Sequence, residues 1–227
     1  TIVTGSLVAL AQDNLKRRLA YSTISQLSYV LLGIGLLASV QAADGTWHEL
    51  AGIGGLAHIG MHAFSKITLF FAAGAIYVAA HKTNISQLDG IGRRMPITMT
   101  AFAIGSLSMI GVPPTAGIVS KWWITKTAGE TSAYVVMAVL FASTLLNAAY
   151  FLPILWRAFF LRGEGDGEGV KEAPWPCVVA LSVTAACTVG LFFAPDVFLT
   201  LAERVTEGVL SAGDALGDAA DTGGGAR

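Results

Sequence analysis

Three basic side chains recur at intervals of four residues in one long apolar stretch: His58, His62 and Lys66. On an α-helix that turns 100° per residue, this spacing places them within an arc of about 80°, rising about 6 Å per step. Imidazole titrates near neutral pH, and loss of solvent makes an ammonium easier to deprotonate. The spacing is therefore typical of a proton relay. The alternative is that the histidines are hydrogen-bonded packing residues and that Lys66 reaches an interface.

The position of Lys66 favours the relay. It lies about 16 residues after Leu50 and about 14 before Ala80, the expected ends of the apolar stretch. If this stretch crosses a bilayer, Lys66 is near its middle, where a charge exposed to lipid is costly. We therefore predict that the two histidines and Lys66 face protein or water rather than lipid.

A second candidate site surrounds Lys121, which follows the segment from Gly111 to Gly117. Pro113 and Pro114 lack N–H donors and clash with the preceding turn, so a helix must break there. Within a membrane, unwound backbone is tolerated only where it lines protein or water. We expect a polar cavity at this break with Lys121 as its protonatable group. The alternative is that Lys121 extends to the outer surface.

A third group of polar residues precedes the first complete apolar stretch. Asp13 and Lys16 could form an ion pair that sets the electric field along a proton path, and the two arginines after Lys16 are expected to anchor the topology. Ser22, Ser25 and Gln26 follow, and such side chains can hold helices together or line a chain of water. For these three, packing is the alternative to lining a path.

The elements that must position these residues are membrane-spanning helices. The chain of 227 residues is 54% hydrophobic and only 13% charged, whereas a soluble domain carries about 25% charged residues. The sequence predicts an all-α, polytopic transmembrane bundle of about five complete spans plus a partial one, with one span broken by proline. The complete spans are expected at residues 19–40, 50–80, 96–126, 132–156 and 173–194.

The partial span is the apolar segment at residues 1–11, which is too short to cross about 30 Å of hydrocarbon. We interpret it as the second half of a helix, and the chain as a C-terminal fragment. Residues 1–195 are predicted to form the transmembrane domain, residues 196–212 an amphipathic helix on the membrane, and residues 213–227 a disordered tail. An acidic loop is expected at residues 44–49 and a flexible linker at residues 162–169.

Basic residues occur in alternate connections between the spans, which predicts that these connections are cytoplasmic and that the chain is a multi-pass protein of the cell (inner) membrane. The net charge of -1 gives no reason to expect nucleic acid as a partner. The two cysteines lie in one apolar run, so neither a disulfide framework nor a zinc motif is expected. We expect no cofactor, no metal and no catalytic constellation, and place any redox or ATP chemistry in partner subunits.

Three segments resemble one family. The segment from Asp13 to Gln26 is similar to the D-x-K-R-x-L-A-Y-S-[ST]-[IM]-S-[QH] signature of the antiporter-like membrane subunits of complex I, membrane-bound hydrogenases and Mrp-type cation/proton antiporters. His58 to Lys66 resembles the H-x-x-x-H-A-F-F-K helix of that family, with Ser65 replacing Phe. Gly111 to Lys121 resembles its G-x-P-P-x-x-G-F-x-[SG]-K break. These motifs cover residues 1 to about 160 in the family's order and look most similar to the MrpD-type subunit of an Mrp-type antiporter.

The resemblance implies a fold of 14 helices made of two inverted five-helix repeats, each with one broken helix. This chain would hold the end of helix 9 and helices 10 to 14. The resemblance also implies that His58 and His62 relay protons between two half-channels and that Lys121 is the terminal protonatable lysine. Asp13 and Lys16 match polar positions near the second half-channel.

We therefore expect a proton- and cation-translocating subunit of a multisubunit complex, the MrpD-type subunit of an Mrp-type Na+/H+ antiporter. Its expected partners are other membrane subunits, protons, Na+ or K+, and the lipid bilayer. One alternative is a proton-pumping subunit of complex I (NADH:quinone oxidoreductase) or of a membrane-bound hydrogenase, with no redox centre in this chain. A second alternative is a structural membrane subunit that does not conduct.

Overall fold

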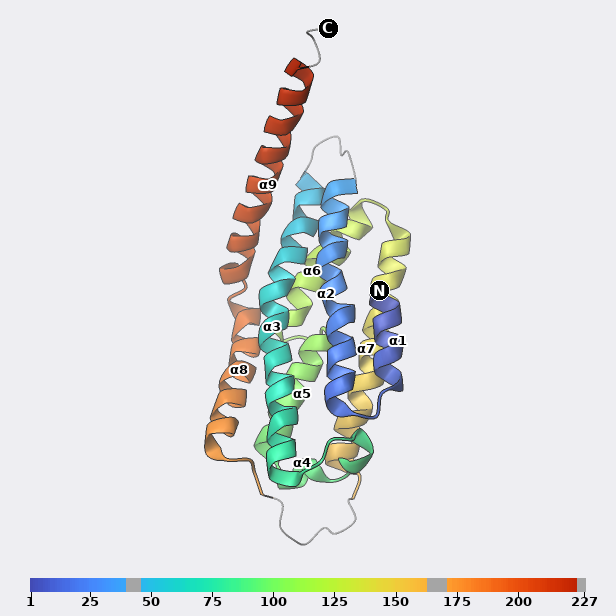
Figure 1. Cartoon of the computed structure of the whole chain (residues 1–227), viewed down its shortest axis with the longest axis vertical. Coiled ribbons are helices and arrows are strands. Elements are labelled where there is room, and N and C mark those ends of the chain that lie inside the picture. Colours follow the sequence, from blue (N-terminus) through green and yellow to red (C-terminus); the bar gives the residue numbers. More distant parts are fainter. Residues whose placement is uncertain (40–45, 163–170, 224–227) are drawn as a thin grey trace.

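The structure, a computed structural model, describes residues 1–39, 46–162 and 171–223, and the side chains of residues 1–37, 49–162 and 171–212. These residues form an all-helical bundle, which confirms the predicted fold class (Figure 1). The elements are α1 (Ile2–Ala11), α2 (Leu15–Ser39), α3 (Thr46–Ala80), a 3-10 turn (Ile85–Gln87), α4 (Ile91–Arg94), α5 (Pro96–Ile110), α6 (Ala116–Glu130), α7 (Tyr134–Phe160), α8 (Trp175–Phe193) and α9 (Asp196–Gly223). Three stretches lie outside the described part: positions 163–169 of the linker expected at 162–169, positions 44–45 of the acidic loop, and the last four residues.

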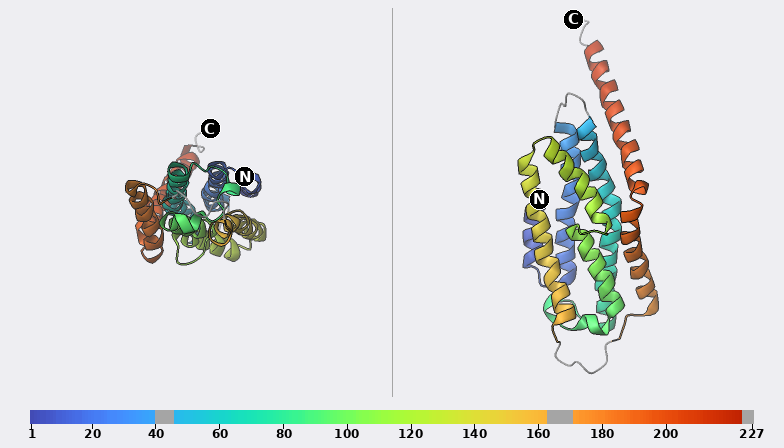
Figure 2. Two further views of the ribbon diagram at one scale, coloured as in Figure 1. Left: turned by 90° about the horizontal axis from the view of Figure 1, so that it is seen from below. Right: turned by 180° about the vertical axis from the view of Figure 1, so that it is seen from behind.

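Four helical segments in the described part are long and apolar enough to cross a membrane: Leu15–Leu37, Glu49–Ala80, Tyr134–Phe160 and Trp175–Phe193. The third predicted span, at residues 96–126, is divided into α5 and α6, which meet near the middle of the bundle (Figure 2). The helix α1 is also apolar and short. The chain is thus a multi-pass integral membrane protein.

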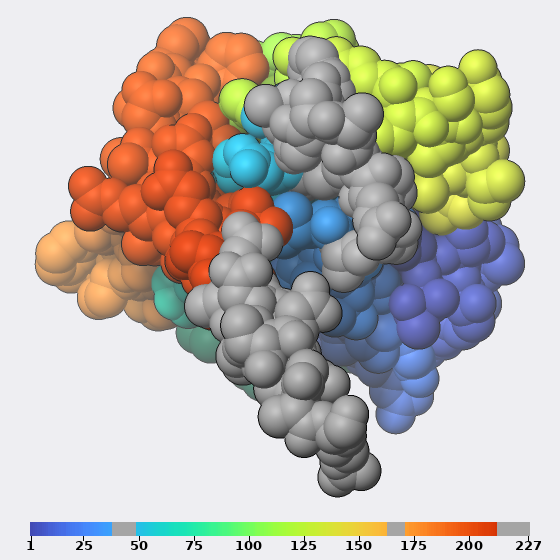
Figure 3. Space-filling view, turned by 90° about the horizontal axis from the view of Figure 1, so that it is seen from above, coloured from blue at the N-terminus to red at the C-terminus, as the bar shows by residue number. Residues whose placement is uncertain are grey.

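The helix α3, with 35 residues, contacts α2, α5, α6, α8 and α9. Figure 3 views the bundle from the end where α9 projects, and shows α8 and α9 on the opposite side from α1 and α7. Because α3 lies between these groups, any polar residue on its inner faces contacts protein on several sides. The candidate residues of α3 are therefore held in the centre of the bundle.

The basic connections lie at one end of the bundle, as the α1–α2 turn, α4, the end of α7 and the start of α8 show in Figure 1. Polar contacts join them. The Arg157 guanidinium donates to both carboxylate oxygens of Asp89, at 2.7 and 3.0 Å. The Glu172 carboxylate accepts the Ile97 N–H at 2.6 Å, at the first turn of α5, where free N–H groups favour an anion.

The helix α9 continues to Gly223, eleven residues beyond the boundary predicted at residue 212. Alanines and Leu216 supply helix formers within the segment predicted to be disordered. Leu199 and Ala202 are buried in a cluster with residues of α3, and α9 extends past the end of the bundle (Figure 1). Val197, Leu201, Val205 and Val209 form an exposed apolar stripe. The predicted domain boundaries and the position of α9 on a membrane stay predictions.

This arrangement predicts the labelling of single cysteines introduced after Cys177 and Cys187 are replaced by alanine. Lys171→Cys, at the basic end, should react with a membrane-impermeant maleimide only from the cytoplasmic side, because basic connections remain inside. Glu130→Cys, at the α6–α7 connection, should react only from the outside. Both residues are exposed in the structure. Labelling of both from the same side would contradict the helix order.

Candidate functional site

The broken helix leaves two backbone carbonyls without their usual donors. The helix α5 ends where Gly111 adopts a left-handed conformation, with φ 94° and ψ 46°. In a continuous helix, the carbonyls of Met109 and Ile110 would accept the N–H groups four residues later. Those residues are Pro113 and Pro114, which have no N–H. The two carbonyls therefore need donors from elsewhere.

Lys121, in the second turn of α6, supplies such a donor. Its Nζ donates to the Met109 carbonyl at 2.6 Å and to the Ile110 carbonyl at 3.3 Å. The same nitrogen lies 5.2 Å from the centre of the Tyr29 ring, within the range of a cation–π contact. The side chain is 7% exposed, so it extends into the bundle and does not reach the surface.

Close packing fixes α6 against the break. The Gly117 N–H donates to Ser108 Oγ at 3.0 Å, and a Cβ at position 117 would overlap the Ser108 carbonyl. Ser65 of α3 donates to the same Ser108 hydroxyl at 2.6 Å. Ser65 stands where the resembling motif has Phe, so the change of residue type adds a hydrogen bond between α3 and the broken helix.

The two histidines and Lys66 face the interior, with exposed fractions of 1% for His58, 4% for His62 and 6% for Lys66. The prediction that this arc faces protein is confirmed. The imidazole rings of His58 and His62 stack with their centres 5.5 Å apart. His58 Nδ1 lies 2.7 Å from the hydroxyl of Ser120, the residue before Lys121. The arc on α3 thus ends beside the lysine of α6.

Several ring nitrogens in this arc have unused hydrogen-bonding capacity. Neither nitrogen of His62, nor Nε2 of His58, has a hydrogen-bond partner among the residues that the structure describes. Buried polar atoms in proteins are nearly always hydrogen-bonded, commonly to ordered water. The nitrogens between Lys66 and Lys121 are therefore suited to bind bridging water.

Polar residues of α2 form a second connection between the lysines. Lys66 Nζ donates to the Leu19 carbonyl at 3.1 Å and also to the Ser22 hydroxyl. Gln26 lies one turn further along the same helix face, and its Nε2 is 3.5 Å from the Met109 carbonyl. One face of α2 thus holds the acceptors of Lys66 and also contacts the Met109 carbonyl, which is an acceptor of Lys121.

The other three predicted residues lie apart from this route. Ser25 faces α1, where its hydroxyl donates to the Ile2 carbonyl at 2.7 Å. Asp13 and Lys16 are exposed at the basic end, and the predicted ion pair between them is not formed. The Asp13 carboxylate accepts the Ser86 hydroxyl at 2.7 Å, and Lys16 Nζ lies 5.3 Å from the centre of the Tyr77 ring. The neighbouring donors of Ser86 satisfy the carboxylate without a lysine.

Sequence reasoning missed two buried polar residues. Asn147 of α7 donates through Nδ2 to the Met109 carbonyl at 3.2 Å, and its Oδ1 accepts the Tyr150 hydroxyl. Arg18, expected as a surface anchor, is 9% exposed and donates to the Gln12 and Tyr150 carbonyls. A carboxamide in the middle of an apolar span was the signal for Asn147, because such groups need a partner in lipid.

A cavity of about 260 Å³ lies beside Lys121, between α2, α6 and α7. Its lining includes two residues that carry hydroxyl groups, Thr125 and Thr144. A lysine that leaves the helix break therefore has polar groups and free volume within its reach.

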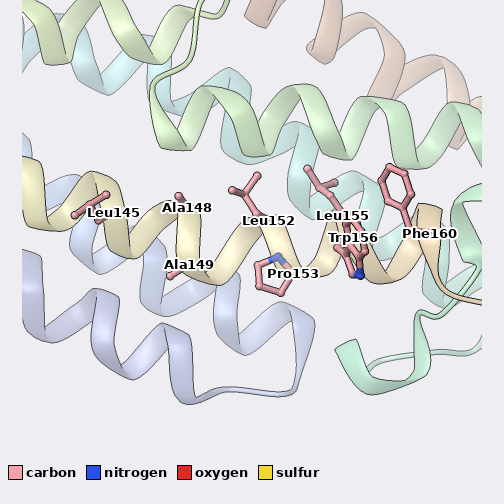
Figure 4. A pocket seen from close by; sticks show the side chains of 8 residues that line it. All are labelled: Leu145, Ala148, Ala149, Leu152, Pro153, Leu155, Trp156 and Phe160. Carbon is pink, nitrogen blue, oxygen red and sulfur yellow. The ribbon is translucent and has the colours of Figure 1, made fainter.

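A groove of about 720 Å³ on the outside of α7 has a different character. All its lining residues come from α7 and none is ionisable: Leu145, Ala148, Ala149, Leu152, Pro153, Leu155, Trp156 and Phe160 (Figure 4). Such a surface suits acyl chains or an apolar helix and offers no proton acceptor. In the described part of the chain, no three His, Cys, Asp or Glu side chains come together in the manner of a metal site.

The sequence from residue 1 to residue 147 matches the family model described as NADH:quinone oxidoreductase/Mrp antiporter, transmembrane. The chain belongs to this family. This membership agrees with the resemblance that the three sequence motifs indicate. The transmembrane description of the family agrees with the apolar helices of the structure.

Similar proteins include membrane subunits of several complexes. The chain is 39% identical to NADH-quinone oxidoreductase subunit N of Desulforudis audaxviator, over 77% of this chain and 33% of that protein. It is 28% identical to F(420)H(2) dehydrogenase subunit N of Methanosarcina mazei, over 90% and 41% of the two chains. A chain in the structure of the Mrp complex from Dietzia sp. DQ12-45-1b has the same fold, with a TM-score of 0.77, 20% identity and coverage of 91% and 45%. This chain thus spans less than half the length of these relatives.

Replacement of Gly117 tests the close contact at the helix break. Gly117→Ala should destabilise the purified protein by about 1–3 kcal/mol, because the new methyl group meets the rigid Ser108 carbonyl. Thermal unfolding in detergent measures the effect. Gly74→Ala is the matched control, since a Cβ there meets nothing within 4 Å and alanine favours the helix by up to about 1 kcal/mol. Equal melting temperatures for the two variants would disprove the contact.

Proposed function

We propose that this chain provides a proton path of an antiporter-like membrane subunit, with Lys66 and Lys121 as its protonatable ends and His58 and His62 between them. The observation that carries the proposal is the burial of both lysines, at 6% and 7% exposure, on either side of two stacked histidines in the same bundle. An uncompensated ionisable group inside a membrane bundle is costly, and such groups commonly belong to ion pathways.

The partners of the lysines support this role. Lys66 donates to a carbonyl and a hydroxyl, and Lys121 donates to two carbonyls. Within the described residues, neither ammonium contacts a carboxylate. A carboxylate would hold a lysine in its charged form, whereas neutral oxygens leave it free to alternate between charged and neutral states. These contacts suit a group that takes up and releases protons.

The proposed route runs from Lys66 through His62 and His58 to Lys121. Water bound at the unused ring nitrogens would carry the proton between groups, since each step exceeds the reach of a direct hydrogen bond. Ser22 and Gln26 supply polar lining from α2. A role in proton transport stays a prediction for the three residues that lie apart from this route, Ser25, Asp13 and Lys16.

The host complex is a separate part of the proposal. Identity of 39% with an NADH-quinone oxidoreductase subunit supports a subunit of a quinone oxidoreductase, in which redox chemistry in other subunits drives the proton. The order and composition of the motifs favour the MrpD-type subunit of an Mrp-type Na+/H+ antiporter as the second candidate. In either case the chain would act with other membrane subunits.

Substitution of Lys121 tests the path. In the complete complex reconstituted into vesicles, Lys121→Ala should abolish proton transport and leave assembly intact. Lys121→Arg should be nearly as inactive, because a guanidinium stays protonated and cannot pass a proton on. Proton uptake is followed with a pH-sensitive dye.

Lys126→Ala is the matched control, since Lys126 is an exposed lysine on the same helix. It should transport at the wild-type rate. Wild-type transport by Lys121→Arg would show that position 121 needs only a fixed charge, and the proposed path would be falsified.

Sodium dependence separates the two host complexes. If the chain serves a quinone oxidoreductase, proton transport should require the electron donor and quinone and should be unchanged when K+ or choline replaces Na+. If it serves an Mrp-type antiporter, a Na+ gradient alone should drive proton movement in the opposite direction. The measurement uses the same vesicles with each driving force applied separately.

A further inference from the structure

Nitrogen donors from three helices approach the Met109 carbonyl at the end of α5. Lys121 Nζ lies at 2.6 Å, Asn147 Nδ2 at 3.2 Å and Gln26 Nε2 at 3.5 Å. A carbonyl oxygen has two lone pairs, so the two shorter contacts are sufficient to satisfy it. Asn147 is therefore the principal donor besides the lysine.

The orientation of the Asn147 amide follows from its neighbours. The Met109 carbonyl can only accept, so it must face the NH2 group of the amide. The amide oxygen then accepts the Tyr150 hydroxyl, which comes from the next turn of the same helix. Asn147 is fully buried, with an exposed fraction of 0%. Its side chain is thus fixed at both ends, independently of Lys121.

A lysine that carries a proton must be able to leave its acceptor during each cycle. The Met109 carbonyl has no helical donor of its own, because Pro113 stands at the position that would supply it. A buried carbonyl that loses every donor is strongly disfavoured, and this would hold Lys121 in place. With Asn147 bound to the same oxygen, one donor remains after the lysine moves away.

The structure also provides a place for the lysine to go. The cavity of about 260 Å³ is lined in part by Lys121 itself, and the Thr125 and Thr144 hydroxyls can accept from its nitrogen or hold water. Tyr29 also lines this cavity, and its ring already contacts the ammonium. Because Lys121 already lines this cavity, the movement that we consider is a rotation of the lysine side chain.

We propose that Asn147 is a positioning residue for Lys121, and that its amide holds the Met109 carbonyl while the lysine moves between this carbonyl and the adjacent cavity. The inference rests on the proposed function, since only a lysine that exchanges its proton has to leave its acceptor. Asn147 does not carry the proton itself.

The test compares variants of the complete complex in reconstituted vesicles. Asn147→Leu keeps the number and branching of the heavy atoms and removes the donor, so the rate of proton transport should fall about tenfold, the factor that corresponds to one hydrogen bond. Asn147→Gln keeps a donor and should recover part of the rate. Tyr150→Phe leaves the amide in place but frees its oxygen, and should lower the rate about threefold.

Ser143→Ala is the matched control. Ser143 is buried one turn before Asn147, and its hydroxyl has no hydrogen-bond partner in the described part of the chain. It should transport at the wild-type rate. Leucine and glutamine both add volume at this buried position, but only glutamine keeps a donor, so a loss of transport in Asn147→Leu that Asn147→Gln partly restores separates positioning from packing.

Wild-type transport by Asn147→Leu would overturn the inference. If that variant does not assemble, wild-type rates in both Asn147→Gln and Tyr150→Phe would overturn it equally. Lys121→Ala, measured in parallel, separates this failure from failure of the proposed path. An inactive Lys121→Ala beside a fully active Asn147→Leu removes only the role of Asn147, whereas a fully active Lys121→Ala removes both.

Discussion

The structure depends on the bond between a buried ammonium and two carbonyls that proline leaves without donors. In a continuous helix, the Met109 and Ile110 carbonyls would accept backbone N–H groups and would not need a side-chain donor. Pro113 and Pro114 remove those two donors, and Lys121 replaces them. The carbonyls that the prolines leave without donors accept the ammonium, and the ammonium gains acceptors in return. Without each other, an unpaired carbonyl and an unpaired ammonium would both be unstable in an apolar surrounding.

The neighbouring elements hold this unit in place. The left-handed Gly111 turns the chain out of α5, and Gly117 lets the start of α6 return against the Ser108 carbonyl. Ser65 then ties Ser108 to α3, the helix that carries the histidines. A contact made for packing therefore also sets the distance between the arc on α3 and the lysine on α6, so stability and the geometry of the route depend on the same few residues.

The sequence was informative where local rules decide the structure. Hydropathy and proline chemistry predicted the spans and the helix break, and the four-residue spacing predicted the buried face of α3. Contacts between helices were harder to predict. Asp13 and Lys16 are close in sequence, but Asp13 lies before α2 begins and meets donors of Ser86, a residue distant in the chain. Asn147 and Arg18 owe their roles to carbonyls on other helices, which no local pattern identifies.

The two lysines are bound in unequal ways, although both donate to backbone carbonyls. The Leu19 carbonyl that accepts Lys66 belongs to an intact helix and also accepts the hydroxyls of Ser22 and Thr23, each at 2.9 Å. The Leu19 carbonyl therefore keeps other hydrogen bonds when Lys66 withdraws. The carbonyls at the break lack helical donors, so withdrawal of Lys121 costs more unless another side chain compensates. Of the two lysines, Lys66 therefore makes contacts that other donors can replace, whereas Lys121 completes the backbone of the broken helix, and the difference arises from the helix break alone.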